Sequence, residues 1–308
     1  MLGLNFNSLF DLTRVFTDEQ TCIEYLEELI WNGNPVSPFD STSKVYKCKG
    51  NKYRCKNTGL YFNVRTNTMF DSTKIKLQKW FMAIWIITSH KKGISSYQLA
   101  KDIYITQKTA WFMLQRIRNC FNIENSHELN NKVEADETYI GGKNKNRHAD
   151  KKIKNAQGRS CKDKAPVFGM VEREGKLVAK KIKSTSSEHL TPEIIKAVRE
   201  SATVYTDEWV GYNAINKIYN HLYVKHNEKE FVKGDIYTNT IEGFWSLLKR
   251  GIIGIYHFTS KKHLQFYVDE FVFRYNTRNF GTETMRFNHL LCNIENKYLP
   301  YKKLIANG

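Results

Sequence analysis

The order of strand-like and helix-like segments after residue 130 constrains the fold more than any other feature of this sequence. Five segments show the alternating or apolar patterns of strands: 132–139, 166–173, 177–182, 202–206 and 222–224. Four show the periodicity of helices: 192–201, 213–220, 240–249 and 263–275. A strand, a hairpin and then strands that alternate with helices predict a mixed α/β domain.

Three acidic residues fall at informative places in this order. Asp136 lies late in the first strand, within ADETYIGGK, and Asp207 ends the strand of VYTDEWVGY. Glu242 lies in the helix of TNTIEGFWSLLKR, and Lys249 follows two turns later on the same helical face. Because catalytic residues favour the ends of strands, we expect the fold to bring these side chains together.

Carboxylates that converge would suit two divalent metal ions held against a phosphodiester. Asp136 is predicted to bridge two Mg²⁺ ions, for which Mn²⁺ could substitute, while Asp207 holds one ion and Glu242 the other. Lys249 is predicted to contact a phosphate near the site. Asn239 precedes Glu242 by three positions and is the alternative third ligand, although an asparagine there more often caps its helix.

The first part of the chain predicts a different architecture. A helix is expected over 18–31, with Thr17 and Gln20 at capping-box positions. Short strands between residues 44 and 64 then suggest a small ribbon module. A module of this size can barely bury a core, so a structural metal would normally hold it together.

Three further helices are expected over 74–90, 95–102 and 107–119. The last two have the spacing of a helix–turn–helix, a motif whose second helix enters the major groove of DNA. The alternative is an ordinary helical bundle. The base-facing end of the second helix would present three candidates for DNA contact: Gln107, Lys108 and Thr109.

The charge of the chain favours a polyanionic partner. Its formal net charge is +17, and nine Lys/Arg between residues 143 and 164 stand against Asp150 and Asp163. Such a run is usually a solvated loop, but one that leaves the strand of Asp136 is well placed to hold DNA phosphates. Five basic residues are predicted to contact DNA: Lys143, Lys145, Lys151, Lys152 and Arg250.

Other features place the protein away from membranes. The longest apolar run, 80–87, is far shorter than the roughly 20 residues that span a bilayer. The N-terminus lacks the pattern of a secretory signal, so we expect a cytoplasmic, nucleoid-associated protein. The six cysteines form no CxxC pair and are expected to be free thiols.

Several stretches together resemble the insertion-sequence DDE transposases of the ISXO-like, zinc-ribbon type. The most specific are ADETYIGGK and the NTIEGFWSLLKR block, and the similarity extends over most of residues 15–290. The resemblance implies a ribonuclease-H-like catalytic fold, magnesium-dependent DNA cleavage and strand transfer, and action as a homo-oligomer on inverted-repeat ends and target DNA. In this family the third metal ligand is sometimes assigned to the asparagine of the NxxE block, which keeps Asn239 as a candidate.

The resemblance fails at the ribbon. The family carries two CxxC pairs, whereas this chain has Ser37-Pro38-Phe39-Asp40 at the first and Cys55-Lys56-Asn57-Thr58 at the second. A structural zinc needs four ligands, mostly thiolate or imidazole. We therefore expect a degenerate ribbon without zinc. Aromatic residues are expected to replace the metal: Tyr46, Tyr53, Tyr61 and Phe62.

The expected organisation has four parts. They are a helix and degenerate ribbon over 1–70, a helix–turn–helix region over 71–125, a ribonuclease-H-like DDE domain over 126–290 and a tail over 291–308. The leading hypothesis is a DNA transposase. A catalytically inactive DNA-binding regulator and a ribonuclease-H-like nuclease or resolvase without strand transfer are the alternatives.

Overall fold

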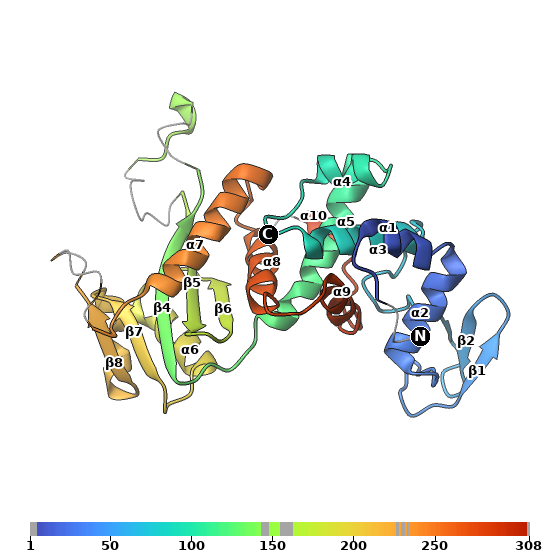
Figure 1. Cartoon of the computed structure of the whole chain (residues 1–308), viewed down its shortest axis with the longest axis horizontal. Coiled ribbons are helices and arrows are strands. Elements are labelled where there is room, and N and C mark those ends of the chain that lie inside the picture. Colours follow the sequence, from blue (N-terminus) through green and yellow to red (C-terminus); the bar gives the residue numbers. More distant parts are fainter. Residues whose placement is uncertain are drawn as a thin grey trace. The chain divides into compact units, whose positions relative to one another are not determined.

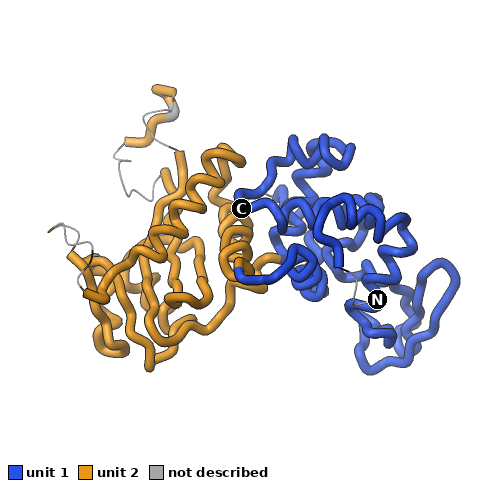
Figure 2. The backbone as a smooth tube through the Cα atoms, viewed as in Figure 1, with its two compact units in different colours: residues 1–120, 279–308 blue, residues 121–278 orange. Residues whose placement is uncertain are grey.

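The chain divides into two compact units, shown in blue and orange in Figure 2. Unit 1 comprises residues 1–120 and 279–308, and unit 2 comprises residues 121–278. A computed structural model describes residues 5–142, 148–154, 163–225, 228, 232 and 234–306. Within these residues, no helix is both long enough and apolar enough to cross a bilayer.

The unit boundaries differ from those expected, because the C-terminal segment packs with the N-terminal part of the chain. Phe287, in α9 (Glu283–Leu291), is fully buried. Its ring lies 5.3 Å from that of Phe6 and 5.4 Å from that of Phe81, centroid to centroid. Residues 279–290, expected in the catalytic domain, thus belong to the core of unit 1, and the aromatic rings supply the reason. Residues 291–308, expected as a tail, are part of the same unit.

Unit 2 is built on one five-stranded sheet (Figure 1). Its strands are β4 (Lys132–Ile140), β5 (Ala165–Glu172), β6 (Leu177–Lys181), β7 (Thr203–Asp207) and β8 (Asn220–Val224). They lie in the order β6-β5-β4-β7-β8; β4, β5 and β6 are antiparallel neighbours, and β7 and β8 continue the sheet in parallel. This is the strand order of a ribonuclease-H-like fold, so the expected fold class is confirmed.

Helices cover both faces of this sheet. On one face, α6 (Ser187–Ala197) and the 3₁₀ helix η4 (Val210–Lys217) share a core with Val133 and Ala135 of β4. On the other face, α7 (Asn239–Gly251) and α8 (Leu264–Asn276) share a core with Val167 and Val171 of β5. Because side chains alternate along a strand, Glu134 and Asp136 must face α7.

Two expected helices of unit 2 differ in extent. α6 begins at Ser187, so Pro192 lies inside the helix rather than at its first position. Burial of both Leu190 and Ile194, four residues apart, explains the earlier start. The segment expected to be helical over 213–220 is a 3₁₀ helix that ends at Lys217, and Asn220 already begins β8.

Unit 1 combines a helical core with the ribbon. Its helices are α1 (Leu9–Val15), α2 (Glu19–Trp31), α3 (Leu77–Ser89), α4 (Ser96–Asp102), α5 (Gln107–Cys120), α9 and α10 (Tyr301–Ile305). The ribbon is an antiparallel sheet of β1 (Val45–Cys48), β2 (Lys52–Cys55) and β3 (Tyr61–Phe62). The capping box of α2 uses Asp18 and Thr21, one residue later than expected, because the Asp18 carboxylate accepts from the Thr21 amide at 2.8 Å.

Aromatic packing holds the ribbon, with different members from those expected. Tyr53 and Phe62 are buried and stack at 5.7 Å, and Trp31 of α2 meets Tyr53 edge-on at 5.2 Å. Tyr46 and Tyr61, which we expected in this core, are 43% and 60% exposed. Lys47 and Phe62 are the strand partners of Tyr53 and share its face of the ribbon. Tyr46 and Tyr61 each lie one position away from these partners, so their side chains point to the opposite face of the ribbon.

The positions at which the resemblance implied CxxC pairs carry hydrogen bonds. The Asp40 carboxylate accepts from the Asn57 side chain at 2.8 Å. Burial alone would raise the pKa of the Cys55 thiol, but hydrogen bonds from Ser37, Ser43 and Thr58 outweigh it and lower the pKa to about 6. One thiolate among hydroxyl groups falls short of the ligand set of a structural zinc.

Chelation is therefore expected to leave the melting of the ribbon unchanged, and elemental analysis of the purified protein should find no stoichiometric zinc. Phe62→Ala, in contrast, should destabilise unit 1 by about 3–5 kcal/mol, because it empties the centre of the aromatic cluster. Thermal melts with and without EDTA check the first result, and urea unfolding checks the second. Zinc bound to residues 35–65 would contradict this account.

Candidate active site

Asp136 and Asp207 lie side by side on adjacent strands. β4 and β7 are parallel, and their last paired residues are Glu134 and Tyr205. The same offset, continued by two residues, places Asp136 level with Asp207. Asp136 lies in the middle of β4, not late in it as expected; Asp207 ends β7. Both carboxylates therefore stand just beyond the paired part of the two strands, on the face that α7 covers.

A cleft of about 940 Å³ opens at this point. It collects four of the five predicted catalytic residues: Asp136, Asp207, Glu242 and Lys249. Its other lining residues are Glu137, Thr138, Tyr139, Lys164, Glu208, Trp209, Val210, Thr238, Trp245 and Ser246. Glu242, Trp245 and Lys249 follow one another at helical spacing, so one face of α7 forms a wall of the cleft.

Asn239 has a different position. It is the first residue of α7, it is exposed, and it is not among the described residues that line the cleft. The expectation that it caps the helix is wrong, because Thr238 occupies the N-cap position. The Thr238 hydroxyl donates to Glu242 Oε1 at 3.3 Å. Of the two candidates for the third ligand, Glu242 is the one that faces the cleft.

The environment of Asp136 is unfavourable for a negative charge. Burial, followed by the nearby carboxylates of Glu137 and Asp207, raises the pKa of Asp136 to about 7. The Trp245 indole N–H partly offsets this by donating to Asp136 Oδ2 at 2.9 Å. A cation at this position would remove the repulsion between the two aspartates.

The donor chemistry fits a divalent metal ion. Asp136 and Asp207 offer carboxylate oxygens, the ligands that Mg²⁺ and Mn²⁺ prefer. A bound cation would neutralise the repulsion between these two carboxylates. Within the described residues, however, no group of three His, Cys, Asp or Glu side chains is gathered tightly enough to hold an ion. Glu242 reaches the cleft from α7 without joining such a group.

Sequence reasoning missed Glu137, which lies on the opposite face of β4 from Asp136. Glu137 is buried, lines the cleft, and accepts a hydrogen bond from the Tyr212 hydroxyl at 2.7 Å. Burial and the neighbouring carboxylates, Glu137 first among them, raise the pKa of Tyr212 well above its usual range. Tyr212 thus stays protonated and holds Glu137 in place.

Gly169 allows Trp245 to reach Asp136. Gly169 pairs with Asp136 across β4 and β5, and a Cβ atom built on it would lie 2.6 Å from the Trp245 ring and 3.0 Å from Ile241. The indole therefore lies directly over the backbone of β5. No larger residue fits at this position unless the ring moves away.

Gly169→Ala is accordingly expected to displace Trp245 and to destabilise the protein by about 1–3 kcal/mol. Gly243→Ala in α7 is the matched control, because no described atom outside the neighbouring residues and backbone of α7 lies within 4 Å of its added Cβ. Removal of a helical glycine should stabilise the protein by about 0.5–1 kcal/mol. Urea unfolding of the two variants checks the opposite signs, and equal effects would contradict the close approach of Trp245.

The predicted DNA-binding residues of the helix–turn–helix partly serve its own structure. Gln107 Nε2 donates to the Ser96 hydroxyl of α4 at 2.8 Å. The Thr109 amide donates to the Thr106 hydroxyl at 3.3 Å, which caps the start of α5. Lys108 is exposed, and its ammonium lies 5.4 Å from the ring centroid of Tyr301.

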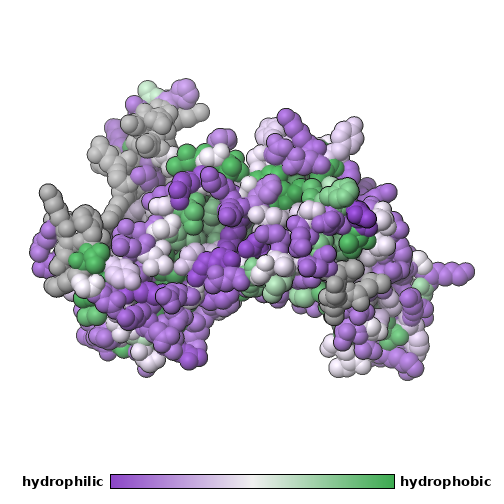
Figure 3. Space-filling model, in the orientation of Figure 1, coloured by the Kyte–Doolittle hydropathy of each residue, from purple (hydrophilic) through white to green (hydrophobic). Residues whose placement is uncertain are grey.

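The other basic candidates are only partly described. Lys143, Lys145 and the side chain of Lys151 lie outside the described residues. Lys152 is exposed after a short 3₁₀ helix, η3 (Ala149–Lys151). Arg250 is exposed on α7, next to Lys249, and its Nε donates to the Ser246 carbonyl at 3.2 Å. Hydrophilic residues cover most of the face seen in Figure 3.

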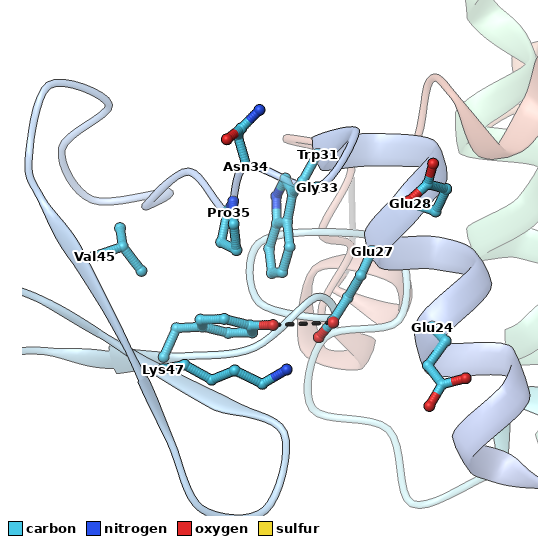
Figure 4. A pocket seen from close by; sticks show the side chains of 10 residues that line it. Glu24, Glu27, Glu28, Trp31, Gly33, Asn34, Pro35, Val45 and Lys47 are labelled. Carbon is cyan, nitrogen blue, oxygen red and sulfur yellow. Dashed lines mark hydrogen bonds between the residues drawn. The ribbon is translucent and has the colours of Figure 1, made fainter. Parts of the chain in front are cut away.

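A second cleft, of about 570 Å³, lies in unit 1 between α2 and the ribbon (Figure 4). Glu24, Glu27 and Glu28 line it from α2, together with Trp31. The Tyr53 hydroxyl donates to Glu27 Oε2 at 2.9 Å, the bond drawn as a dashed line in Figure 4. The lining of this cleft thus ties the ribbon to α2.

The sheet and its acidic cleft define a ribonuclease-H-like domain. Residues 128–276, nearly all of unit 2, match the family of the ISXO2-like transposase domain. Over these residues the chain is similar to the ISXO2-like transposases, and the expected resemblance is confirmed.

Two further similarities accompany this match. An uncharacterized protein in the transposable element ISH50 of Halobacterium salinarum is 27% identical over 250 residues, which cover 77% of this chain and 84% of that protein. A crystal structure of a pre-cleavage Mos1 transpososome aligns over 95% of this chain and 98% of its own, with 11% identity and a TM-score of 0.23.

Proposed function

We propose that this protein is a metal-dependent transposase that cleaves DNA at the inverted-repeat ends of an insertion sequence and transfers the freed strands to target DNA. The observation that carries the proposal is the convergence of Asp136, Asp207, Glu242 and Lys249 on one cleft of an ISXO2-like transposase domain. The similarity to a protein in the transposable element ISH50 supports the same proposal.

In this proposal Asp136 and Asp207 hold the metal ions, with Glu242 as the third ligand. Two bound Mg²⁺ or Mn²⁺ ions would activate an oxygen nucleophile and stabilise the leaving oxygen of a phosphodiester. Trp245 orients the Asp136 carboxylate through its indole N–H. Lys249 and Lys164, the basic residues of the cleft lining, are placed to bind the negatively charged phosphate backbone.

We assign recognition of the element ends to unit 1. Its helix–turn–helix, α4 and α5, would enter the major groove, and the ribbon would add backbone contacts. The net charge of +17 favours tight association with DNA in the nucleoid. Pairing of two element ends requires more than one copy of the chain, so we propose a homo-oligomer on DNA.

A cleavage and strand-transfer assay tests this function. The substrate is DNA from either side of the gene, labelled at its ends and supplied intact or already cut, together with a supercoiled target plasmid and Mg²⁺. Cleavage followed by joining supports a transposase. Cleavage without joining of the pre-cut ends would indicate a nuclease or resolvase, and specific binding without either reaction would indicate a regulator.

The third ligand can be identified separately. Glu242→Gln is expected to lower the cleavage rate at least about a hundredfold, whereas Asn239→Ala should leave it within about threefold, because Glu242 alone faces the cleft. Single-turnover cleavage rates over a range of Mg²⁺ concentrations measure both variants. A greater loss in Asn239→Ala would transfer the assignment to the asparagine.

A further inference from the structure

Glu134, which precedes Asp136 by two residues on β4, is completely buried. The side chain of Glu134 has no exposed surface, and its carboxylate accepts four hydrogen bonds. Three come from the first turn of α7: the Thr240 amide at 2.8 Å, the Thr240 hydroxyl at 2.9 Å and the Ile241 amide at 3.1 Å. The fourth comes from Arg173 Nε at 2.8 Å.

Arg173 extends this attachment to the segment that leads into α7. Its guanidinium donates to the carbonyls of Asp235 and Tyr237, each at 2.9 Å. It lies over two aromatic rings, that of Tyr237 at 3.6 Å and that of Tyr205 on β7 at 4.2 Å from the centroid. Its side chain is only 10% exposed. Arg173 thus connects the end of β5, the middle of β7 and the segment that precedes α7.

These bonds replace the usual local cap of a helix. Thr238, the N-cap of α7, makes no side-chain capping bond to the first-turn amides of the described helix. The Glu134 carboxylate takes over this task from a strand 106 positions away in the chain. Its negative charge is also favourable beside the positive end of the helix dipole.

β4 therefore holds α7 at two points, one on each side of Glu242. Glu134 binds the helix at Thr240 and Ile241, and Asp136 binds it at Trp245. Glu134 and Asp136 are two residues apart on the same face of the strand, roughly 7 Å along its axis. The position of Glu242 relative to Asp136 is consequently set by this double attachment.

We propose that Glu134 and Arg173 are positioning residues, which fix α7 along β4 and so set the separation of the Glu242 and Asp136 carboxylates for metal binding. The inference rests on the proposed function, because it takes these two carboxylates to be metal ligands. Glu134 itself is buried under α7 and does not line the cleft among the residues described. Its effect on the metal is transmitted through the helix.

The chain offers a closely matched control. In α8, Glu270 is likewise fully buried and pairs at 2.6 Å with Arg274, whose side chain is 11% exposed. This pair has the same burial as Glu134 and Arg173, but the Glu270 carboxylate accepts a hydrogen bond from Tyr256, beyond the C-terminal end of α7, whereas Glu134 binds the first turn of α7 next to Glu242. A purely structural role for Glu134 would make the two pairs equivalent in every measurement except their contribution to stability.

The test measures Mn²⁺ affinity of the full-length chain without DNA, by calorimetry and by electron paramagnetic resonance. Glu134→Gln is expected to weaken Mn²⁺ binding by roughly 10–100-fold, while Glu270→Gln leaves the affinity unchanged even if it melts at an equally low temperature. Arg173→Lys keeps a charge beside Glu134 but loses the forked bonds, so it should weaken Mn²⁺ binding less. It also serves as the test if Glu134→Gln fails to fold.

Equal Mn²⁺ affinities in folded Glu134→Gln, or Arg173→Lys, and in Glu270→Gln would overturn the inference. Failure of the proposed function has a different signature. Wild-type protein would then bind Mn²⁺ and show the same order of affinities among the variants, yet would neither cleave nor join the DNA described above.

Discussion

Asp136→Asn and Asp207→Asn are each expected to lower DNA cleavage by roughly a thousandfold or more, while the affinity for element ends stays at the wild-type value. Each change removes a carboxylate oxygen from the cleft without altering the size of the side chain. The two residues lie in unit 2, whereas we assign end recognition to the helix–turn–helix of unit 1. Cleavage of labelled end DNA and gel-shift titration measure the two activities separately.

Glu193→Gln is a suitable control for these variants. Glu193 lies in α6, on the opposite face of the sheet, where it pairs with Lys180 at 2.7 Å. Its replacement should leave the cleavage rate unchanged. Wild-type cleavage by Asp136→Asn or Asp207→Asn in Mg²⁺ would remove these residues from the proposed site.

The second large effect concerns stability rather than catalysis. Without metal, Asp136→Asn is expected to be more stable than the wild-type protein above pH 7, by an amount on the order of a few kcal/mol. The pKa of Asp136 rises to about 7 in the folded protein, from the ordinary value of 3.8 for an aspartate side chain. The unfolded chain therefore releases this proton near pH 4, whereas the folded chain retains it until about pH 7.

The direction in which wild-type stability changes with pH follows from this difference in proton binding. Over the interval from about pH 4 to about pH 7 the folded state binds more protons than the unfolded state, so wild-type stability falls as pH rises and stays low above pH 7. Asparagine carries no charge and escapes this loss. The two proteins should converge below about pH 4, where the carboxyl is protonated in both states.

Thermal melts at pH 8 in EDTA and in Mg²⁺ provide the measurement. Mg²⁺ should raise the melting temperature of the wild-type protein and leave that of Asp136→Asn nearly unchanged, because the variant lacks a ligand. Identical melts of the two proteins in EDTA would show that the Asp136 carboxylate is not strained by its surroundings. The electrostatic repulsion at Asp136 would then no longer favour a bound cation at this site.

Much of the fold was predictable because its signals are local. The alternation in β4 and β7 placed Asp136 and Asp207 on strands, and the spacing of Glu242 and Lys249 placed both on one helical face. Periodicity in a short window contains this information, and the order of the elements then predicted a mixed α/β domain. The family resemblance led to the same domain.

The features of the fold and the site that the sequence did not predict depend on contacts between residues far apart in the chain. Neither the role of Glu134 nor the absence of a cap at Asn239 can be read locally, because the carboxylate that binds the first turn of α7 comes from β4. Gly169 appears as an ordinary strand glycine until Trp245 is placed over it. α9 was missed as part of unit 1 because Phe287 meets Phe6 only in the folded chain.

The discontinuity of unit 1 affects the order in which the two units can form during synthesis. All residues of unit 2 have been made once the ribosome has passed residue 278, whereas unit 1 lacks Phe287 until residues 279–308 have also emerged. The nascent protein can thus complete the sheet of unit 2 before the aromatic core of unit 1. Shortened copies that end after unit 2 would keep all strands of that sheet and would lack the aromatic residue that closes the N-terminal core.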